Sequence, residues 1–222
     1  MSRAPLHRQT HSALARRAVV AGLGAVAASG PAWSAPVSAS GQKIVTLLGD
    51  SITAGYGLAA KDALPAQLEL ALHRLGVGAQ VRGAGVSGDT TGDGLARVEF
   101  SVRADTSLCL VALGGNDLLQ GDDPAQTKAN LIAILARLKA RHIKGALAGM
   151  RAPTQIGAGF AHDFNAAFPD AAEAGHAPLY PFLLDGVAGN AALLQGDHIH
   201  PNPAGVKIIA ARLAPFVAKN LK

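Results

Sequence analysis

Cysteine, aromatic and charged residues are all scarce in this sequence. Its 222 residues contain one cysteine, Cys109, which excludes any disulfide bond within the chain. Cys109 lies in the apolar run 108–111, so we expect a buried small side chain rather than a nucleophile. Only 4% of the residues are aromatic and 16% are charged, whereas 49% are hydrophobic. This composition is typical of a globular chain and excludes a disordered one.

No hydrophobic stretch is long enough to predict a transmembrane helix. The small apolar stretch 18–28 has 11 residues, too few to span a bilayer as a helix. It follows the pair Arg16 and Arg17, and Ser-Gly-Pro at 29–31 interrupts it. These features predict a signal peptide, and the paired arginines favour the twin-arginine route over the general secretory one. An uncleaved membrane anchor is the alternative.

The domain organisation follows from this segment. We expect residues 1–40 to hold the signal peptide and the disordered start of the mature chain, with cleavage after Ser34 or after Ala39. Residues 41–222 should form one domain, because no repeat or long linker interrupts them. The mature protein would be periplasmic or secreted, with no stable membrane span.

The excess of positive charge is confined to the N-terminal segment. Of the 20 Lys and Arg residues, four lie in residues 1–40, where there is no acidic residue. The rest of the chain carries 16 basic and 15 acidic side chains and is nearly neutral. A nucleic-acid-binding surface needs clustered Lys and Arg, so we expect no nucleic-acid partner.

From residue 43 onward, short apolar runs alternate with amphipathic stretches. We expect strands at 43–48, 77–86, 108–113, 145–150 and 178–182, and helices at 62–75, 91–102, from 124, 161–174 and 203–218. This alternation predicts βαβ units, and therefore an α/β fold with a parallel sheet covered by helices on both faces. Ligands bind such sheets at the carboxyl ends of the strands.

Two segments at opposite ends of this domain carry the residue types needed for acyl transfer. Segment 49–53 reads Gly-Asp-Ser-Ile-Thr and directly follows the first strand, and segment 197–201 reads Asp-His-Ile-His-Pro. A serine, a histidine base and a carboxylate that orients the base are the minimum for nucleophilic catalysis. Taken alone, the first segment could instead place Asp50 or Ser51 as a helix cap.

Two further loops offer hydrogen-bond donors at the same predicted edge. Segment 85–91 follows the second strand and 114–117 follows the third. The backbone N–H groups of Ser51 and Gly88 and the side-chain amide of Asn116 could stabilise an oxyanion. Each loop alone could be an ordinary turn, but three such loops after successive strands favour a shared site.

The two histidines of the last segment need separate interpretations. Asp197, His198 and His200 could suggest a metal site, but they are a sparse ligand set for zinc, which usually has three or four protein ligands. As a base, His200 has a carboxylate in Asp197 close at hand. We expect His198 to be a bystander, because extended backbone beside the prolines would turn its side chain away from that of His200.

These four segments together resemble the SGNH hydrolases, also called GDSL lipases and esterases. The resemblance covers residues 43–218 and is greatest for the bacterial periplasmic arylesterases and multifunctional thioesterase/lysophospholipases. It implies a flavodoxin-like three-layer α/β/α sandwich with a five-stranded parallel sheet. It also implies that Ser51 is the nucleophile, His200 the base and Asp197 its partner, with Ser51, Gly88 and Asn116 forming the oxyanion hole.

The same resemblance implies a substrate class. We expect a small-molecule acyl ester, aryl or short-to-medium in chain length, with thioesters and lysophospholipids as further candidates and no metal or organic cofactor. A carbohydrate or cell-wall O-acetylesterase is the alternative activity, and a non-catalytic binding protein on the same scaffold is the alternative of another class. An α/β-hydrolase is excluded, because the chain has no Gly-x-Ser-x-Gly motif.

Overall fold

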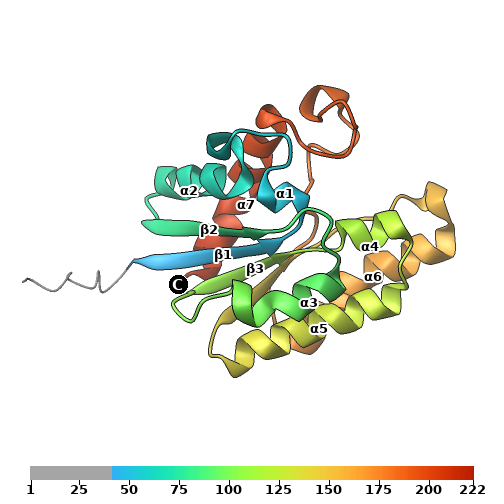
Figure 1. Cartoon of the computed structure of the whole chain (residues 1–222), viewed down its shortest axis with the longest axis horizontal. Helices are drawn as coiled ribbons and strands as arrows, with labels where there is room; N and C mark the ends of the chain where they lie inside the picture. Colours follow the sequence, from blue (N-terminus) through green and yellow to red (C-terminus); the bar gives the residue numbers. More distant parts are fainter. Residues whose placement is uncertain (1–41) are drawn as a thin grey trace, which may run out of the picture. The chain divides into compact units, whose positions relative to one another are not determined.

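The computed structural model describes residues 42–222, so the expected signal peptide at 1–40 lies outside the described residues. These residues form one parallel sheet of five strands (Figure 1). In chain order the strands are β1 (Lys43–Gly49), β2 (Ala79–Gly85), β3 (Leu108–Ala112), β4 (Lys144–Ala148) and β5 (Leu179–Tyr180). Their order across the sheet is β2-β1-β3-β4-β5, with β1 and β3 at the centre.

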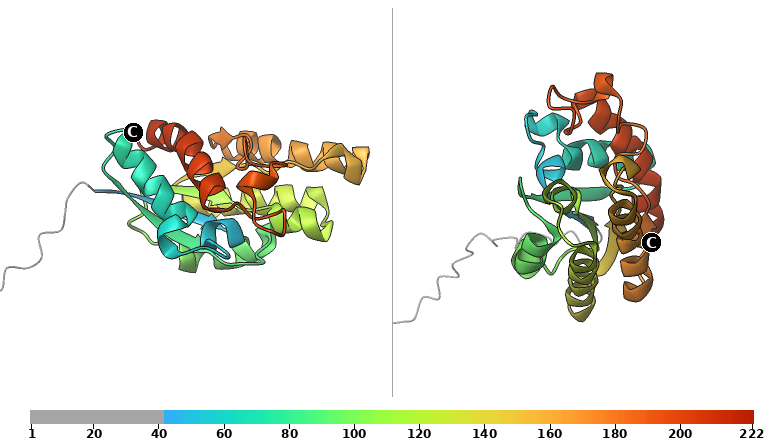
Figure 2. Two further views of the ribbon diagram at one scale, coloured as in Figure 1. Left: turned by 90° about the horizontal axis from the view of Figure 1, so that it is seen from above. Right: turned by 90° about the vertical axis from the view of Figure 1, so that its right-hand side faces the viewer.

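Five long helices cover the two faces of the sheet. They are α2 (Leu64–Arg74), α3 (Thr91–Ser101), α5 (Pro124–Ala140), α6 (Ala158–Gly175) and α7 (Pro203–Asn220). Helix α2 packs against α7 on one face, while α5 packs against α3 and α6 on the other (Figure 2). The α/β class and the three-layer sandwich with five parallel strands predicted from the sequence are therefore confirmed.

Shorter elements lie in the connections, mostly at the carboxyl ends of the strands. They are α1 (Ser51–Ala54), η1 (Ala60–Asp62), α4 (Gly115–Gln120), η2 (Thr154–Ile156) and η3 (Ala191–Leu193). Among the residues described, no helix combines the length and apolarity needed to cross a membrane.

The boundaries of several elements differ from those predicted. Strand β5 has two residues rather than the five of 178–182, because Pro178 and Pro181 flank it and cannot donate to a strand ladder. Helix α2 begins at Leu64 with a proline in its first turn, so residue 62 belongs to the preceding 3₁₀ turn. Helix α4 was not predicted at all, since its six residues begin with a Gly-Asn pair typical of turns.

The central strands are buried from both faces. All five residues of β3 are buried, and so are the last five of β1. Cys109 is fully buried there, and burial raises the pKa of its thiol to about 12, which confirms the small hydrophobic role predicted for it. Burying each of the leucines of these strands stabilises the fold by roughly 1.5–3 kcal/mol. The strands on which the site is built are therefore rigid.

Replacing Gly49 with alanine should destabilise the domain. An added Cβ would overlap the Thr53 side chain and lie 2.9 Å from the Ala112 carbonyl oxygen. We expect the Gly49→Ala variant to lose about 1–3 kcal/mol of unfolding free energy in urea denaturation. Gly78→Ala is the matched control, because nothing lies within 4 Å of its added Cβ. Equal stability of the two variants would contradict the tight packing at Gly49.

Candidate active site

Ser51 lies where the central strand β1 ends. The Asp50 side chain accepts a hydrogen bond of 3.0 Å from the Ile52 N–H and so caps helix α1, of which Ser51 is the first residue. The helix-cap interpretation of this segment therefore holds for Asp50. Because Asp50 provides the cap, the Ser51 hydroxyl is available for another contact at the edge of the sheet.

The structure brings Ser51, His200 and Asp197 together. His200 Nε2 lies 2.8 Å from Ser51 Oγ, although the two residues are 149 positions apart. On the other side of the ring, Nδ1 lies 2.6 Å from Asp197 Oδ2. An ionised carboxylate only accepts hydrogen bonds, so Nδ1–H donates to Asp197 and Nε2 can accept the Ser51 proton.

Asp197 is held in its ionised form by nearby donors. Its Oδ1 accepts the backbone N–H groups of Ile199 at 2.9 Å and of His200 at 3.0 Å. The backbone hydrogen bond from His200, followed by the side-chain bond from the same residue, keeps the pKa of Asp197 well below its ordinary value. Asp197 is therefore charged at neutral pH, where it can pair with the imidazole of His200.

Gln195 ties the His200 loop to the loop that follows Ser51. Its side-chain amide donates to the Tyr56 carbonyl at 2.8 Å, and its backbone N–H donates to the His200 carbonyl at 2.8 Å. The Tyr56 ring lies against the imidazole of His200, with ring centroids 4.7 Å apart. No signal in the sequence marks Gln195 or Tyr56 as part of the site, because neither belongs to a motif with its own chemistry.

His198 does not have the extended backbone that was expected of it. Its φ is +59°, in the left-handed region, and its side chain is exposed. This conformation turns the chain between Asp197 and His200 so that their side chains meet. Among residues 42–222, no group of three or more His, Cys, Asp or Glu residues is arranged to hold a metal ion.

The three residues with predicted oxyanion donors, Ser51, Gly88 and Asn116, line one cavity together with His200. Its volume is about 220 Å³. Gly88 follows β2 with a φ of +92° in an exposed loop, and within the described part of the chain its N–H and that of Ser51 donate to no other protein group. The Asn116 amide donates one hydrogen bond of 2.8 Å to the Asp89 carbonyl, which leaves its second N–H available.

Helix α4 is the element that fixes Asn116. The neighbouring Asp117 is buried and accepts the Thr91 N–H at 2.8 Å, and it also accepts the hydroxyl groups of Thr91 and Thr127. These bonds attach α4 to the start of α3 and to α5. The Gly-Asn-Asp sequence after β3 therefore has two roles, with Asn116 facing the cavity and Asp117 anchoring the helix.

Apolar side chains form the rest of the cavity and its rim. Tyr56 is 54% exposed, Leu119 61% and Ile199 44%, and all three line the cavity. Large apolar side chains with this exposure around a polar centre are suited to contact an apolar ligand. The sequence does not predict these rim residues, because single apolar residues far apart in the chain form no periodic pattern.

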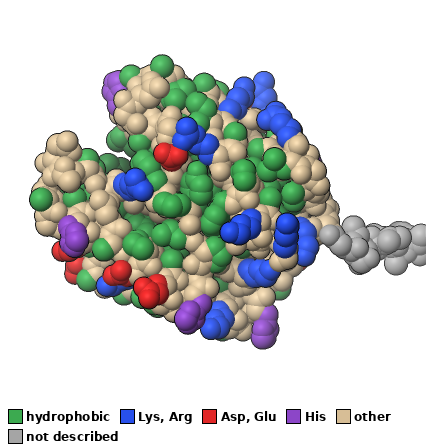
Figure 3. All heavy atoms as spheres, turned by 180° about the vertical axis from the view of Figure 1, so that it is seen from behind, with side chains coloured by type: hydrophobic (Ala, Val, Ile, Leu, Met, Phe, Trp, Pro, Cys, Tyr) green, Lys and Arg blue, Asp and Glu red, His purple; other side chains and the backbone are tan. Residues whose placement is uncertain are grey.

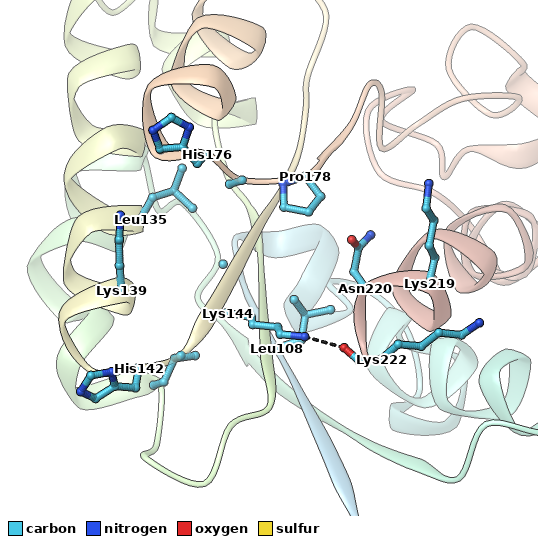
Figure 4. Close-up of a pocket in the computed structure, with 14 residues that line it drawn as sticks. Leu108, Leu135, Lys139, His142, Lys144, His176, Pro178, Lys219, Asn220 and Lys222 are labelled. Carbon is cyan, nitrogen blue, oxygen red and sulfur yellow. Dashed lines mark hydrogen bonds between the residues drawn. The ribbon is translucent and has the colours of Figure 1, made fainter.

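A second cavity lies at the opposite, amino edge of the sheet (Figure 4). Its volume is about 600 Å³, and its lining includes six basic side chains: Lys139, His142, Lys144, His176, Lys219 and Lys222. Lys and Arg side chains gather over this edge in the space-filling view (Figure 3). In Figure 4, however, the labelled lysines point in different directions and do not converge on one point, so the cavity is not organised around a single anion.

The fold and the Ser51–His200–Asp197 contact define a serine hydrolase of the SGNH type. A solved structure described as AlinE4, an SGNH-hydrolase family esterase, is 43% identical with a TM-score of 0.68, and covers 82% of this chain and 97% of that one. The similarity extends over nearly all of the described residues.

The chain belongs to the GDSL-like lipase/acylhydrolase family, whose model matches residues 47–208. The Escherichia coli K12 protein named thioesterase 1/protease 1/lysophospholipase L1 is 36% identical over 169 residues, 76% of this chain and 80% of that protein. The Vibrio mimicus arylesterase is 33% identical over 176 residues, 79% of this chain and 88% of that protein. This protein is therefore an ester-hydrolysing serine hydrolase, with a small-molecule ester as its substrate class.

Asp50 should make stability fall as the pH rises. The side chain is 2% exposed, and burial raises its pKa from 3.8 to about 6. The native state therefore holds this proton more tightly than the unfolded chain, so stability decreases as pH rises between these values. The Asp50→Asn variant keeps the cap without the charge, and its advantage over the wild type should grow by up to about 3 kcal/mol from pH 4 to pH 7.

Urea denaturation at several pH values tests this expectation. Asp105→Asn is the control of opposite sign, because the hydrogen bond from Arg82 lowers the pKa of the exposed Asp105 carboxyl. Because the native state favours the charged form of Asp105, the stability of Asp105→Asn relative to the wild type should stay constant or fall as the pH rises over the same range. A constant difference between Asp50→Asn and the wild type from pH 4 to pH 7 would refute the role of Asp50.

Proposed function

We propose that this protein hydrolyses carboxylic esters through an acyl-enzyme on Ser51, with His200 as general base and Asp197 as the group that orients it. The observation that carries this proposal is the continuous contact from Ser51 Oγ through the imidazole to Asp197, at 2.8 and 2.6 Å. The contact opens onto a cavity that also contains Gly88 and Asn116. A base within hydrogen-bond reach of the nucleophile is the first geometric requirement for this chemistry.

The reaction follows from these positions. Ser51 Oγ attacks the ester carbonyl carbon while His200 Nε2 takes its proton, and Asp197 stabilises the resulting imidazolium. The N–H groups of Ser51 and Gly88 and the free N–H of Asn116 stabilise the oxyanion. His200 then protonates the leaving alcohol or thiol, the C–O or C–S bond breaks, and a water activated by His200 releases the acid and restores Ser51.

The cavity favours acyl groups of short to medium length. At about 220 Å³ it is smaller than the usual range for drug-sized ligands, roughly 300–1,000 Å³, and the apolar side chains at its rim can contact the part of a chain that extends outside. Aryl esters are one candidate substrate. Thioesters and lysophospholipids are others. The first is in line with the name of the Vibrio mimicus relative, and the other two with that of the Escherichia coli relative.

A labelling experiment combined with an acyl-chain series tests the proposal. A fluorophosphonate should form one adduct, on Ser51, and Ser51→Ala should lose the adduct and at least roughly 10³-fold of kcat. Ser87→Ala, which removes another hydroxyl group lining the same cavity, is the control and should keep the adduct.

p-Nitrophenyl esters and matching thioesters with acyl chains of two to sixteen carbons should give the highest kcat/KM at short to medium chain length.

Two results would contradict this assignment. The absence of an adduct on Ser51 in folded wild-type protein would favour the non-catalytic binding protein. A strong preference for acetylated xylan or peptidoglycan over hexanoyl esters would favour the O-acetylesterase.

The same proposal includes export of the chain. The pair Arg16 and Arg17, the apolar stretch 18–28 and a hydrolase domain at 41–222 support a signal peptide in residues 1–40 and a periplasmic or secreted mature form. Mass spectrometry of the periplasmic fraction should find a mature N-terminus after Ser34 or Ala39. Changing both arginines to lysine should block twin-arginine export. An unprocessed chain held in the membrane fraction would contradict cleavage.

A further inference from the structure

Arg97 joins three segments that meet at the active site. It lies on α3, and its side chain is mostly buried, at 18% exposure. Its Nη2 donates to the Gly49 carbonyl at 2.8 Å, and Nη1 donates to the Ala84 carbonyl at 3.0 Å. Its Nε donates to Asp89 Oδ2 at 2.5 Å. One guanidinium thus holds the carboxyl ends of β1 and β2 and the loop that follows β2.

The two carbonyl groups are close to proposed catalytic residues. Gly49 precedes Ser51 by two positions, and its carbonyl also accepts the Val86 N–H at 3.1 Å. Ala84 is the next-to-last residue of β2, from which the Gly88 loop departs. Arg97 therefore sets the spacing between the strand end that carries Ser51 and the loop that carries Gly88.

Asp89 extends this connection to Asn116. The Asp89 carboxylate pairs with Arg97, its N–H donates to the Val86 carbonyl at 3.2 Å and closes the turn around Gly88, and its carbonyl accepts the Asn116 amide at 2.8 Å. Any movement of Asp89 would shift Gly88 and Asn116 together. All three proposed oxyanion donors thus depend on contacts that lead back to Arg97.

We propose that Arg97 is a positioning residue that aligns the oxyanion donors of Ser51, Gly88 and Asn116. Arg97 lines no part of the Ser51 cavity, so it acts through these three groups, and its role depends on their assignment in the proposed function. The planar guanidinium suits this task, because its donors form a rigid fork that a lysine cannot reproduce. Donors for an oxyanion must be held in place before the reaction to be effective.

The alternative is that Arg97 only stabilises the fold. Without Arg97, the Asp89 carboxylate, which is only 11% exposed and lies near the buried Asp50, would have no charged partner. An unpaired charge with so little solvent contact would lower the stability of the fold. The experiment must therefore separate a loss of rate from a loss of folded protein. Arg141→Met is a matched control, since Arg141 is also partly buried and donates to one backbone carbonyl, that of Val102 at the far end of α3.

Steady-state kinetics with a p-nitrophenyl ester test the role of Arg97. Arg97→Met should lower kcat by roughly 10–100-fold, somewhat less than the 10²–10³-fold expected for loss of one oxyanion donor, and should change KM by less than about threefold. Arg97→Lys should recover part of kcat, because it keeps one charged donor. Arg141→Met should keep kcat within about twofold of the wild type, whatever its stability.

A double-mutant cycle with Asn116→Ala shows whether Arg97 acts through the oxyanion donors. Arg97→Met should cost less in the Asn116→Ala background than alone, by about threefold or more, since the two changes remove the same alignment. If Arg97→Met does not fold, the same cycle is measured with Arg97→Lys. Equal costs in both backgrounds, or kcat within about threefold of the wild type for both Arg97 variants, would overturn the proposal.

These results can be told apart from a failure of the proposed function. The Ser51 adduct is measured in the wild type, where Arg97 is intact. If no adduct forms there, the assignment of Ser51 fails. If the adduct forms and the Arg97 variants keep wild-type rates, only the positioning role of Arg97 fails.

Discussion

The contact between Ser51 Oγ and His200 Nε2 is the interaction on which the proposed function of the whole domain depends. It joins the end of the first strand to a loop just before the last helix, and the parallel sheet, with all its carboxyl ends on one edge, brings both to the same place. The buried strands β1 and β3 make that edge rigid, whereas the histidine comes from a loop. The side chain of Gln195 donates to the Tyr56 carbonyl and thereby ties the histidine loop to the loop that follows β1.

Two carboxyl groups lie at the candidate active site, and their surroundings give them opposite properties. Asp50 is adjacent to Ser51 in sequence, but burial raises its pKa to about 6 and it caps a helix. Asp197 is 146 positions away, is open to solvent and accepts three hydrogen bonds, which lower its pKa. In the proposed mechanism a charged partner stabilises the imidazolium, so the distant carboxylate has the role of orienting the histidine, whereas the adjacent one supports the backbone.

The sequence predicted the sheet, its layers and the residues that meet at its edge, because strand periodicity and the loops that follow strands are local signals. The two-residue strand β5, helix α4 and the left-handed backbone at His198 were missed or wrongly expected. Each depends on tertiary contacts, such as the hydrogen bonds of buried Asp117 that hold α4 in place. The roles of Gln195 and Arg97 were not predicted for the same reason, because hydrogen bonds to backbone carbonyls far away in the sequence produce no local sequence pattern.

The distribution of these contacts explains how the domain can separate rate from substrate choice. The proposed oxyanion donors are fixed by buried or half-buried polar contacts of Arg97, Asp89 and Asp117. These contacts tolerate little movement. The rim is made of exposed apolar side chains such as Leu119 and Ile199, which have few constraints of their own. Under the proposed function, substitutions at the rim should therefore alter which acyl group is accepted without disturbing the proposed oxyanion donors, whereas substitutions of the buried polar residues should change the rate of the reaction itself.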